Sequence, residues 1–297
     1  MIFSYRSTLV DRETMKAKNL LTPIDTDKWF ELLKQDKLGL YGNSATLIDE
    51  NIRPLLETDK FDELFSVVNH FDQQWLKHNR LIIFELAMYV WAGFKAGKFS
   101  ADTWATVFSV AWQSGSRGMM AGVKLTQAQV LEFFNAAPRS RIQRMAEFEG
   151  EDLNAEYEAL PEEFLVFRGV STGIDHYENG FSWTRNAEEV MKFAALNCHS
   201  RKEIPGVVQA VIPKEAVLAL FSYEGEVVVN PTVKKISVET YFLRGKELRD
   251  FHANVDVEAN TQDVMFKTGY QAKRLATNML DAKQKPSYMG QAVPFGE

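Results

Sequence analysis

The sequence contains a single cysteine, Cys198, and only five histidines. One cysteine excludes an intramolecular disulfide, and no histidine has a second histidine or cysteine at the spacing of a metal site. We therefore expect no structural metal and no metal cofactor. His199 follows Cys198 directly, but adjacent side chains on a helix diverge by about 100°. A catalytic thiol and its base are rarely built from neighbours in sequence, so we expect Cys198 to be a buried structural residue.

Long apolar runs and excess positive charge are also missing. The most apolar stretch, residues 81–94, carries Glu85 and is shorter than the roughly 20 residues that span a bilayer. Residues 1–16 have charges where a signal peptide needs an apolar core. The net charge of −6 gives no general attraction to nucleic acid or to an anionic membrane. These features predict a globular protein that is not exported.

Apolar residues, in contrast, are plentiful: they make up 45% of the 297 residues, and aromatic residues make up 12%. The first half of the chain has helical periodicity, and hydroxyl residues precede several of its apolar stretches, as at helix N-termini. We predict helices that begin near Thr26, Thr58, Leu81, Ser100 and Thr126. These helices would form a helical domain over residues 1–150, of unknown role, with the tryptophans in its core.

A shift in composition marks the end of this helical half. Residues 145–163 contain eight acidic side chains and no basic one. Like-charged stretches of this kind are typical of a solvated linker or a connecting helix. We therefore expect an acidic linker over residues 151–163 and a second domain from residue 164 to 250, or as far as 297.

After Pro161 the periodicity becomes that of extended chain, which predicts an α+β protein. Stretches rich in β-branched and aromatic residues, bounded by Gly, Pro or Asn, predict strands at residues 164–170, 180–184, 206–213, 225–231 and 234–243. Helices are expected at residues 186–198 and 214–220, and a further helix at 269–284, with a loosely held end.

Three sets of polar residues in this second half have side chains suited to binding or catalysis. Arg168 lies inside an apolar strand, where a guanidinium needs a carboxylate or an anionic ligand. Ser182 and Thr184 share one face of a short strand. Glu224 and Glu226 flank a glycine, and in an extended chain they would point to the same side, where their charges repel unless a cation lies between them.

The order of these residues resembles the mono-ADP-ribosyltransferase family, in its phage and bacterial members. The resemblance is carried by "VFRG", "GFSWTRNAEEVMKFA" and "VVQAVIPKEAVLALFSYEGEVVVNP", and it covers about residues 160–243. It implies a catalytic domain of two packed small β-sheets with flanking helices. It also implies that NAD is the substrate and that no metal takes part.

The resemblance further implies a role for each residue. Arg168 would hold the diphosphate of NAD, and Gly169 would allow its backbone to approach the nicotinamide amide. Ser182 would orient the catalytic glutamate while Thr184 supports the strand. Glu226 would stabilise the ribosyl cation that forms when nicotinamide leaves. Glu224 and Tyr223 would recognise the target, and a glutamate at position 224 implies that the modified side chain is arginine.

The expected function is therefore transfer of ADP-ribose from NAD to a target macromolecule, most readily arginine side chains of a protein. Because phage members of the family often modify host proteins, the expected target is a bacterial host protein in the host cytoplasm. Three alternatives stay open: a nucleic-acid acceptor, an NAD glycohydrolase, and a catalytically silent phage protein with a binding or structural role. A glycoside hydrolase is disfavoured, because two glutamates so close on one strand cannot flank opposite faces of a sugar.

Overall fold

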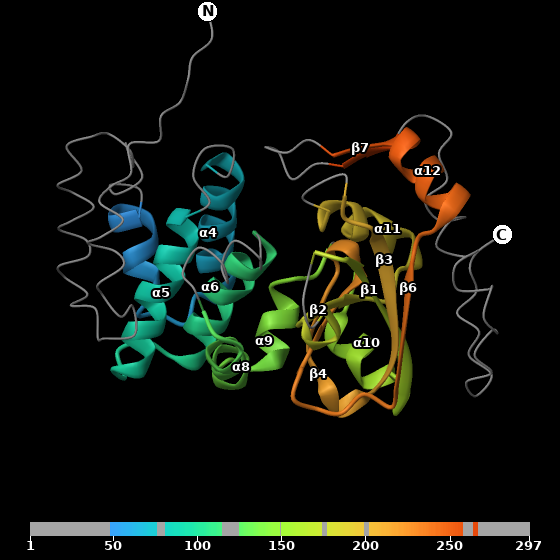
Figure 1. Cartoon of the computed structure of the whole chain (residues 1–297). Coiled ribbons are helices and arrows are strands. Elements are labelled where there is room, and N and C mark those ends of the chain that lie inside the picture. Colours follow the sequence, from blue (N-terminus) through green and yellow to red (C-terminus); the bar gives the residue numbers. More distant parts are fainter. Residues whose placement is uncertain are drawn as a thin grey trace, which may run out of the picture. The chain divides into compact units, whose positions relative to one another are not determined.

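The computed structural model describes residues 48–75, 81–114, 125–148, 150–173, 177–198, 202–257 and 264–266. The chain divides into two compact units, Met1–Arg141 and Ile142–Glu297. The first is helical and the second combines an antiparallel sheet with helices (Figure 1). Of the helices in the described residues, none is long and apolar enough to cross a membrane.

The first unit is built from amphipathic and buried helices with defined starts. Ser100 caps α6 by accepting a hydrogen bond from the Thr103 amide, and Thr126 forms a capping box with Gln129 at the start of α8. Such caps satisfy amides that have no partner within the helix. The elements are η1 (Ile48–Ile52), η2 (Arg53–Leu55), α4 (Phe61–Trp75), α5 (Leu81–Lys95), α6 (Ala101–Gln113) and α8 (Gln127–Ala136), followed by α9 (Arg139–Arg144) at the boundary between the units.

Aromatic side chains fill the core of this unit. Trp104 is fully buried, and its indole nitrogen donates to the carbonyl of Phe133 at 3.0 Å. The Trp91 ring lies 4.9 Å from that of Trp104 and 4.6 Å from that of Phe133, centroid to centroid. Aromatic pairs at these separations stabilise a core beyond the area that they bury. The prediction of tryptophans in the core is confirmed for Trp91, Trp104 and Trp112, whereas the predicted helix near Thr26 lies outside the described residues.

The second unit begins with α10 and continues into a six-stranded sheet. All neighbouring strands are antiparallel, and their order is β4-β5-β2-β1-β3-β6. The elements are α10 (Leu153–Ala159), β1 (Glu163–Ser171), η3 (Tyr177–Asn179), β2 (Ser182–Thr184), α11 (Ala187–Leu196), β3 (Pro205–Pro213), η4 (Lys214–Ala216), β4 (Val217–Phe221), η5 (Tyr223–Gly225), β5 (Glu226–Val229), β6 (Ser237–Phe242) and α12 (Gly245–Asn254). The strands predicted at 164–170, 180–184, 206–213, 225–231 and 234–243 are confirmed as β1, β2, β3, β5 and β6, with shorter bounds for several.

The sheet consists of two three-stranded halves with one narrow connection. β1 pairs with β3 along nine residues, but with β2 only through Phe167 opposite Thr184. The strands β1, β3 and β6 therefore form one half, and β4, β5 and β2 form the other. This connectivity places the start of β5 close to β1, although the two strands are distant in sequence.

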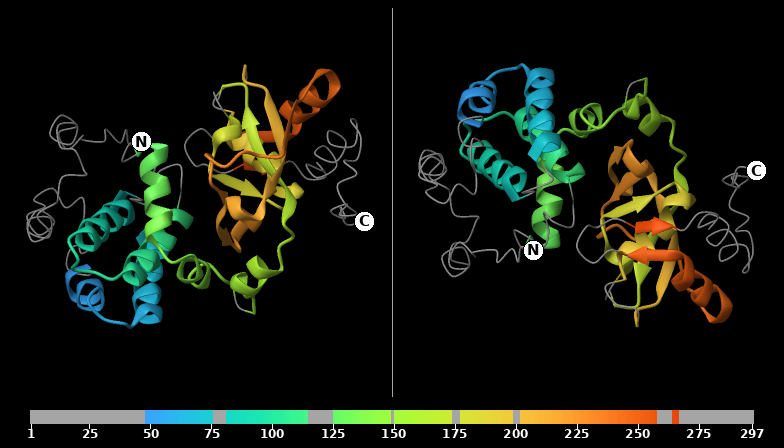
Figure 2. Two further views of the ribbon diagram at one scale, coloured as in Figure 1. Left: turned by 90° about the horizontal axis from the view of Figure 1, so that it is seen from below. Right: turned by 90° about the horizontal axis from the view of Figure 1, so that it is seen from above.

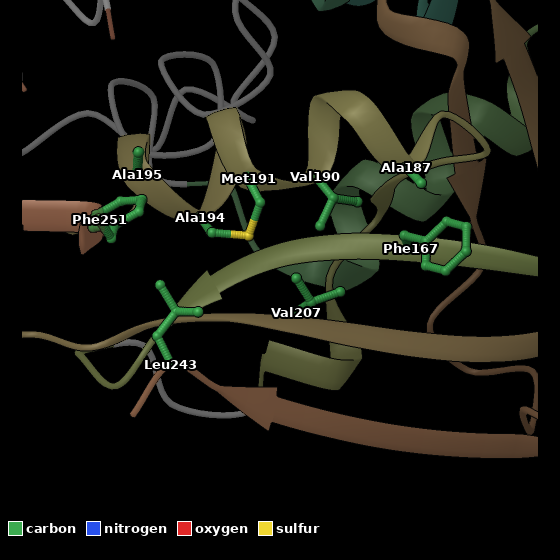
Figure 3. Close-up of a cluster of buried hydrophobic side chains, with 9 residues drawn as sticks. All are labelled: Phe167, Ala187, Val190, Met191, Ala194, Ala195, Val207, Leu243 and Phe251. Carbon is green, nitrogen blue, oxygen red and sulfur yellow. The ribbon is translucent and has the colours of Figure 1, made fainter. Parts of the chain in front are cut away.

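Helix α11 covers the first half of the sheet (Figure 3). Val190, Met191 and Ala194 of the helix are fully buried and pack with Phe167 and Val207 of the strands. Burial of one such large apolar side chain stabilises the fold by about 1.5–3 kcal/mol. The helix predicted at residues 186–198 is thus confirmed, with bounds of 187–196.

One segment of the second unit differs from the predictions. Residues 214–220 were expected to be helical, but they form a 3₁₀ turn followed by β4. The helical prediction was wrong because Val217, Leu220 and Phe221 pair with β5, and such pairing overrides the local propensity of a short apolar run. The expected acidic linker contains α10, whose Leu153 and Tyr157 are buried.

The last described elements were not predicted. Helix α12 follows β6, and β7 (Val255–Val257) pairs with β8 (Val264–Phe266) in a separate ribbon that contacts α11 (Figure 2). The polar composition after residue 243 gave no strong periodic signal for either. The helix expected at 269–284 and the end of the chain lie outside the described residues.

Candidate functional site

Arg168 lies on β1 beside the short strand β2. Its Nη1 donates a hydrogen bond to the backbone oxygen of Ser182. Gly180 provides the space for the guanidinium, because a Cβ atom there would overlap Arg168 Cζ and both terminal nitrogens. The hydrogen bond to Ser182 and the space at Gly180 therefore help to position the guanidinium of Arg168 beside β2.

A second cation, Lys235, lies in the same neighbourhood. Its ammonium sits 5.5 Å from the ring centroid of the buried Trp183, a cation–π arrangement. The pKa of Lys235 is lowered, mainly by burial and also by the charge of Arg168, while Glu178 acts in the opposite direction. Lys235 therefore lies near both the Arg168 guanidinium and the Glu178 carboxylate, and the charge of Glu178 affects it more strongly than that of Arg168.

Gly169, the next residue, packs directly against α11. A Cβ atom at this position would overlap backbone atoms of Val190 and Ala194. The carbonyl oxygen of Gly169 accepts a 2.6 Å hydrogen bond from Asn197 Nδ2. Helix packing thus accounts for the glycine, and its predicted approach to a nicotinamide amide remains a prediction.

Ser182 and Thr184 lie at the two ends of β2 and face β5 in the pairing register. Ser182 stands opposite Val228, and Thr184 stands opposite Glu226. Thr184 is almost completely buried, and its hydroxyl donates to the carbonyl oxygen of Glu224 at 2.7 Å. The same hydroxyl accepts a 2.9 Å hydrogen bond from the Asn186 amide. Thr184 therefore connects the turn before β5 to the start of α11.

Glu224 occupies a strained position in that turn. Its φ and ψ are 62° and 11°, and it is the one non-glycine residue with positive φ in the described part of the chain. Gly225 follows with φ of 58°. A left-handed conformation costs a non-glycine residue about 1–2 kcal/mol, and such strain often occurs at functional sites. The expectation that Glu224 and Glu226 alternate along one extended strand is wrong, because only Glu226 belongs to β5.

The side chain of Glu224 is paired with a lysine from α11. Lys192 Nζ lies 2.6 Å from Glu224 Oε1 and 3.3 Å from Glu189 Oε2. Glu224 has 18% of its side chain exposed. Burial raises the pKa of Glu224 and the nearby Glu189 adds to this, while the hydrogen bond and charge of Lys192 act to lower it. Burial and the lysine partner thus act in opposite directions on the ionisation of Glu224.

Glu226 begins β5 and is partly buried. It lies between Thr184 of β2 and Phe221 of β4 in the pairing register. Two residues of strand span about 6.6 Å and paired strands lie about 5 Å apart, so the Cα atoms of Ser182 and Glu226 are separated by about 8 Å.

The printed contacts connect several of the predicted residues through β2: Arg168 donates to the Ser182 backbone oxygen, and Thr184 stands opposite Glu226 and donates to the Glu224 carbonyl oxygen. Arg168 and Gly169 come from β1, Ser182 and Thr184 from β2, and the two glutamates from η5 and β5. Tyr223 lies in the same turn as Glu224, but its side chain is outside the described set. No sequence motif pointed to Lys192, Lys235 or Gly180. The Glu189–Lys192 spacing of one helical turn is visible in the sequence, but it gives no sign that Glu224 joins the pair.

Cys198 is buried, and burial together with the charge of Glu203 raises the pKa of its thiol to about 12. Its Sγ donates to the carbonyl oxygen of Ala194 at 3.4 Å. The prediction of a buried thiol is confirmed, and His199 lies outside the described residues. Within the described part of the chain, no group of three or more His, Cys, Asp or Glu side chains is arranged to hold a metal ion.

Comparisons with models of known families, with curated proteins and with solved structures found no match.

Proposed function

We propose that the second unit is a mono-ADP-ribosyltransferase domain. In this proposal it transfers ADP-ribose from NAD to a target macromolecule, with arginine side chains of a protein as the favoured acceptor, and releases nicotinamide. The observation that carries the proposal is the set of contacts at β2, where Ser182 accepts from Arg168 through its backbone oxygen and Thr184 stands opposite Glu226 and donates to the Glu224 carbonyl oxygen. These are the residues through which the sequence resembles the family.

The topology also supports the finer fold that this family implies. The expected domain has two packed small sheets, and the six strands here divide into halves joined at Phe167 and Thr184 alone. Arg168, which is proposed to bind the diphosphate, lies on one half. The proposed catalytic carboxylate lies on the other half, so NAD would bind where the halves join.

The proposed reaction follows from the charges at this junction. The bond between C1′ of the ribose and the nicotinamide nitrogen breaks, and its electron pair leaves with nicotinamide, which becomes neutral. Glu226 stabilises the positive charge that develops on the ribose, while Arg168 and Lys235 hold the diphosphate. A nitrogen of the target guanidinium then forms a bond to C1′ and gives up a proton, for which Glu224 is the nearest proposed acceptor.

A second candidate function is favoured by one specific contact. Glu224 is already paired with Lys192, so its carboxylate is not open to a target cation in this conformation. A site in which water rather than guanidinium attacks C1′ would be an NAD glycohydrolase. The two functions share Glu226 and differ in their dependence on Glu224.

The test is incubation of the full chain with NAD labelled in its adenylate phosphate, followed by measurement of free nicotinamide and of labelled acceptor. Agmatine serves as a guanidinium acceptor, cadaverine as an ammonium acceptor, and a bacterial extract as a source of macromolecules. We expect Glu226→Gln to lower both nicotinamide release and transfer by about 100-fold to 1,000-fold, the usual effect of losing a preorganised electrostatic partner. Glu224→Gln should abolish transfer and retain part of the hydrolysis.

Glu215→Gln provides the matched control, because Glu215 is an exposed glutamate of the same unit. Nicotinamide release without labelled acceptor would establish the glycohydrolase. Label that nuclease removes would identify a nucleic-acid acceptor. If the wild type neither consumes NAD nor labels any acceptor, the proposal is wrong and the silent binding or structural role remains.

A further inference from the structure

Lys192 is shared between two carboxylates from different elements. Its ammonium lies 2.6 Å from Glu224 in the η5 turn and 3.3 Å from Glu189, one helical turn earlier in α11. The side chains of Lys192 and Glu189 have 33% and 28% of their area exposed, whereas Glu224 has 18%. The lysine thus has a more buried partner and a more exposed partner within reach at the same time.

This arrangement determines which molecules have access to the Glu224 carboxylate. Water carries no charge and gains nothing by separating the ammonium from Glu224. A guanidinium brings its own positive charge and a planar fork that binds both oxygens of a carboxylate, which an ammonium does not do. A cationic acceptor is therefore able to replace Lys192 at Glu224, and a water molecule is not.

Displacement of Lys192 leaves no isolated charge in the interior. When the ammonium moves away from Glu224, it remains paired with Glu189 on its own helix, and its exposed third contacts solvent. The incoming guanidinium neutralises Glu224 in turn. Each carboxylate keeps a cationic partner before and after the exchange, which avoids the cost of an unpaired buried charge.

We propose that Lys192 is a specificity-determining residue that reserves Glu224 for a cationic acceptor by occupying its carboxylate until a guanidinium displaces the ammonium toward Glu189. This inference rests on the proposed transferase function. In the absence of an acceptor, Lys192 also prevents Glu224 from taking a proton from water. NAD hydrolysis, in which a water oxygen bonds to C1′ as nicotinamide leaves with the electron pair, is thereby kept slow.

The experiment compares Lys192→Met, Glu189→Gln and the double variant Lys192→Met/Glu224→Gln with the wild type. For each, nicotinamide release is measured without acceptor, and the KM and kcat for agmatine are measured with it. Because loss of Lys192 removes the group that lowers the pKa of Glu224, the measurements are made over a pH series that extends to about pH 8.5. Lys246→Met, at an exposed position of α12, is the control.

We expect Lys192→Met to lower the KM for agmatine by about twofold to tenfold, the range of a partly exposed ion pair. Its hydrolysis without acceptor should rise by about tenfold, since Glu224 then acts as a base toward water. The double variant should return to the hydrolysis rate of Glu224→Gln alone. Glu189→Gln should raise the KM for agmatine, because the displaced ammonium loses its second partner.

The two single variants are thus expected to move the KM in opposite directions, which a general loss of structure would not produce. If Lys192→Met raises the KM or leaves hydrolysis unchanged while the wild type cleaves NAD, the inference is wrong and the proposed function stands.

Lys192→Gln replaces Lys192→Met if the latter melts at a lower temperature than the wild type. Calorimetric titration of agmatine without NAD tests the displacement separately: binding that is no tighter in Lys192→Met than in the wild type contradicts it, even if the wild type shows no NAD cleavage.

Discussion

The hydroxyl of Thr184 and the backbone oxygen of Glu224 form a 2.7 Å hydrogen bond between β2 and the turn that precedes β5. The bond holds Glu224 in a left-handed conformation, with φ of 62°, that a glutamate rarely adopts. A buried threonine thereby fixes the backbone from which the Glu224 side chain reaches Lys192.

Replacement of Thr184 tests this support. Thr184→Val keeps the shape of the side chain but leaves the Glu224 carbonyl and the Asn186 amide without the hydroxyl, so we expect a loss of about 1–3 kcal/mol in the free energy of unfolding. Transfer to agmatine should fall more than NAD hydrolysis. Thr184→Ser retains the hydroxyl and should recover most of both, as measured by urea denaturation and by the nicotinamide assay. Equal stability of the valine and serine variants would show that the hydrogen bond contributes little.

The guanidinium of Arg168 occupies the space that a side chain at Gly180 would fill, so a substitution at Gly180 tests the position of Arg168. Gly180→Ala places a methyl group where the guanidinium lies, so Arg168 must leave its position beside Ser182. Because charge-assisted hydrogen bonds to phosphate contribute about 1.5–3 kcal/mol, we expect the KM for NAD to rise about tenfold or more. Arg168→Lys, which keeps the charge without the fork, should show a similar change. An unchanged KM for NAD in both variants would remove Arg168 from the substrate site.

Substitutions at Gly225 measure the cost of backbone strain in the η5 turn without a cost of steric overlap. Its φ is 58°, and a Cβ atom would meet only ordinary contacts, the nearest at 3.6 Å to Asn186. Gly225→Ala should therefore lose about 1–2 kcal/mol of stability through strain alone, whereas Gly225→Asn should lose less, since asparagine tolerates this conformation. Gly97→Ala, at a φ of +74° in the helical unit, should be destabilised similarly but keep full transfer activity.

The burial of Glu224 predicts a pH dependence of stability. Its pKa is raised in the folded protein, mainly by burial, so between the unfolded pKa near 4.5 and the higher folded pKa the folded state binds more protons than the unfolded state. Stability from this group therefore falls as pH rises through that window. Glu224→Gln has no such titration, and its stability relative to the wild type should increase from pH 4 to pH 8 in urea denaturation. A constant difference would contradict the raised pKa.

Cys198 should be chemically silent in the folded state. Its thiol is buried, with a pKa raised to about 12, and thiolate is the form that reacts with disulfide reagents. We expect negligible reaction with a chromogenic disulfide at pH 8 and complete reaction of one thiol per chain in denaturant. Fast reaction of the native protein would show that the segment around Cys198 opens readily.

The elements that the sequence predicted well are those with a strong local signal. β1 and β3 are long apolar runs bounded by proline, and α11 combines helical spacing with polar residues at its start. Residues 214–220 carry a weaker signal, since alanine and leucine favour a helix while the pairing with β5 requires a strand. In that segment the tertiary partner, not the local sequence, determines the structure.

The sequence named candidate site residues, but it did not predict the geometry that the structure gives them. The motif placed Arg168, Ser182 and Glu226 together, and the strand order agrees with that proximity. The positive φ of Glu224 depends on a hydroxyl 40 residues away, and its ion pair depends on a lysine 32 residues away. Neither contact has a local signature, because both arise only when α11 and η5 are brought against β2.

The single pairing of Phe167 with Thr184 has a mechanical consequence. A small rotation of one three-stranded half against the other would pivot at this position and leave the remaining strand pairings intact. Arg168 lies on β1 in one half, whereas Glu226 lies on β5 in the other half and Glu224 lies in the turn that precedes β5. In the proposed transferase, such a rotation would change the separation between Arg168 and the two glutamates.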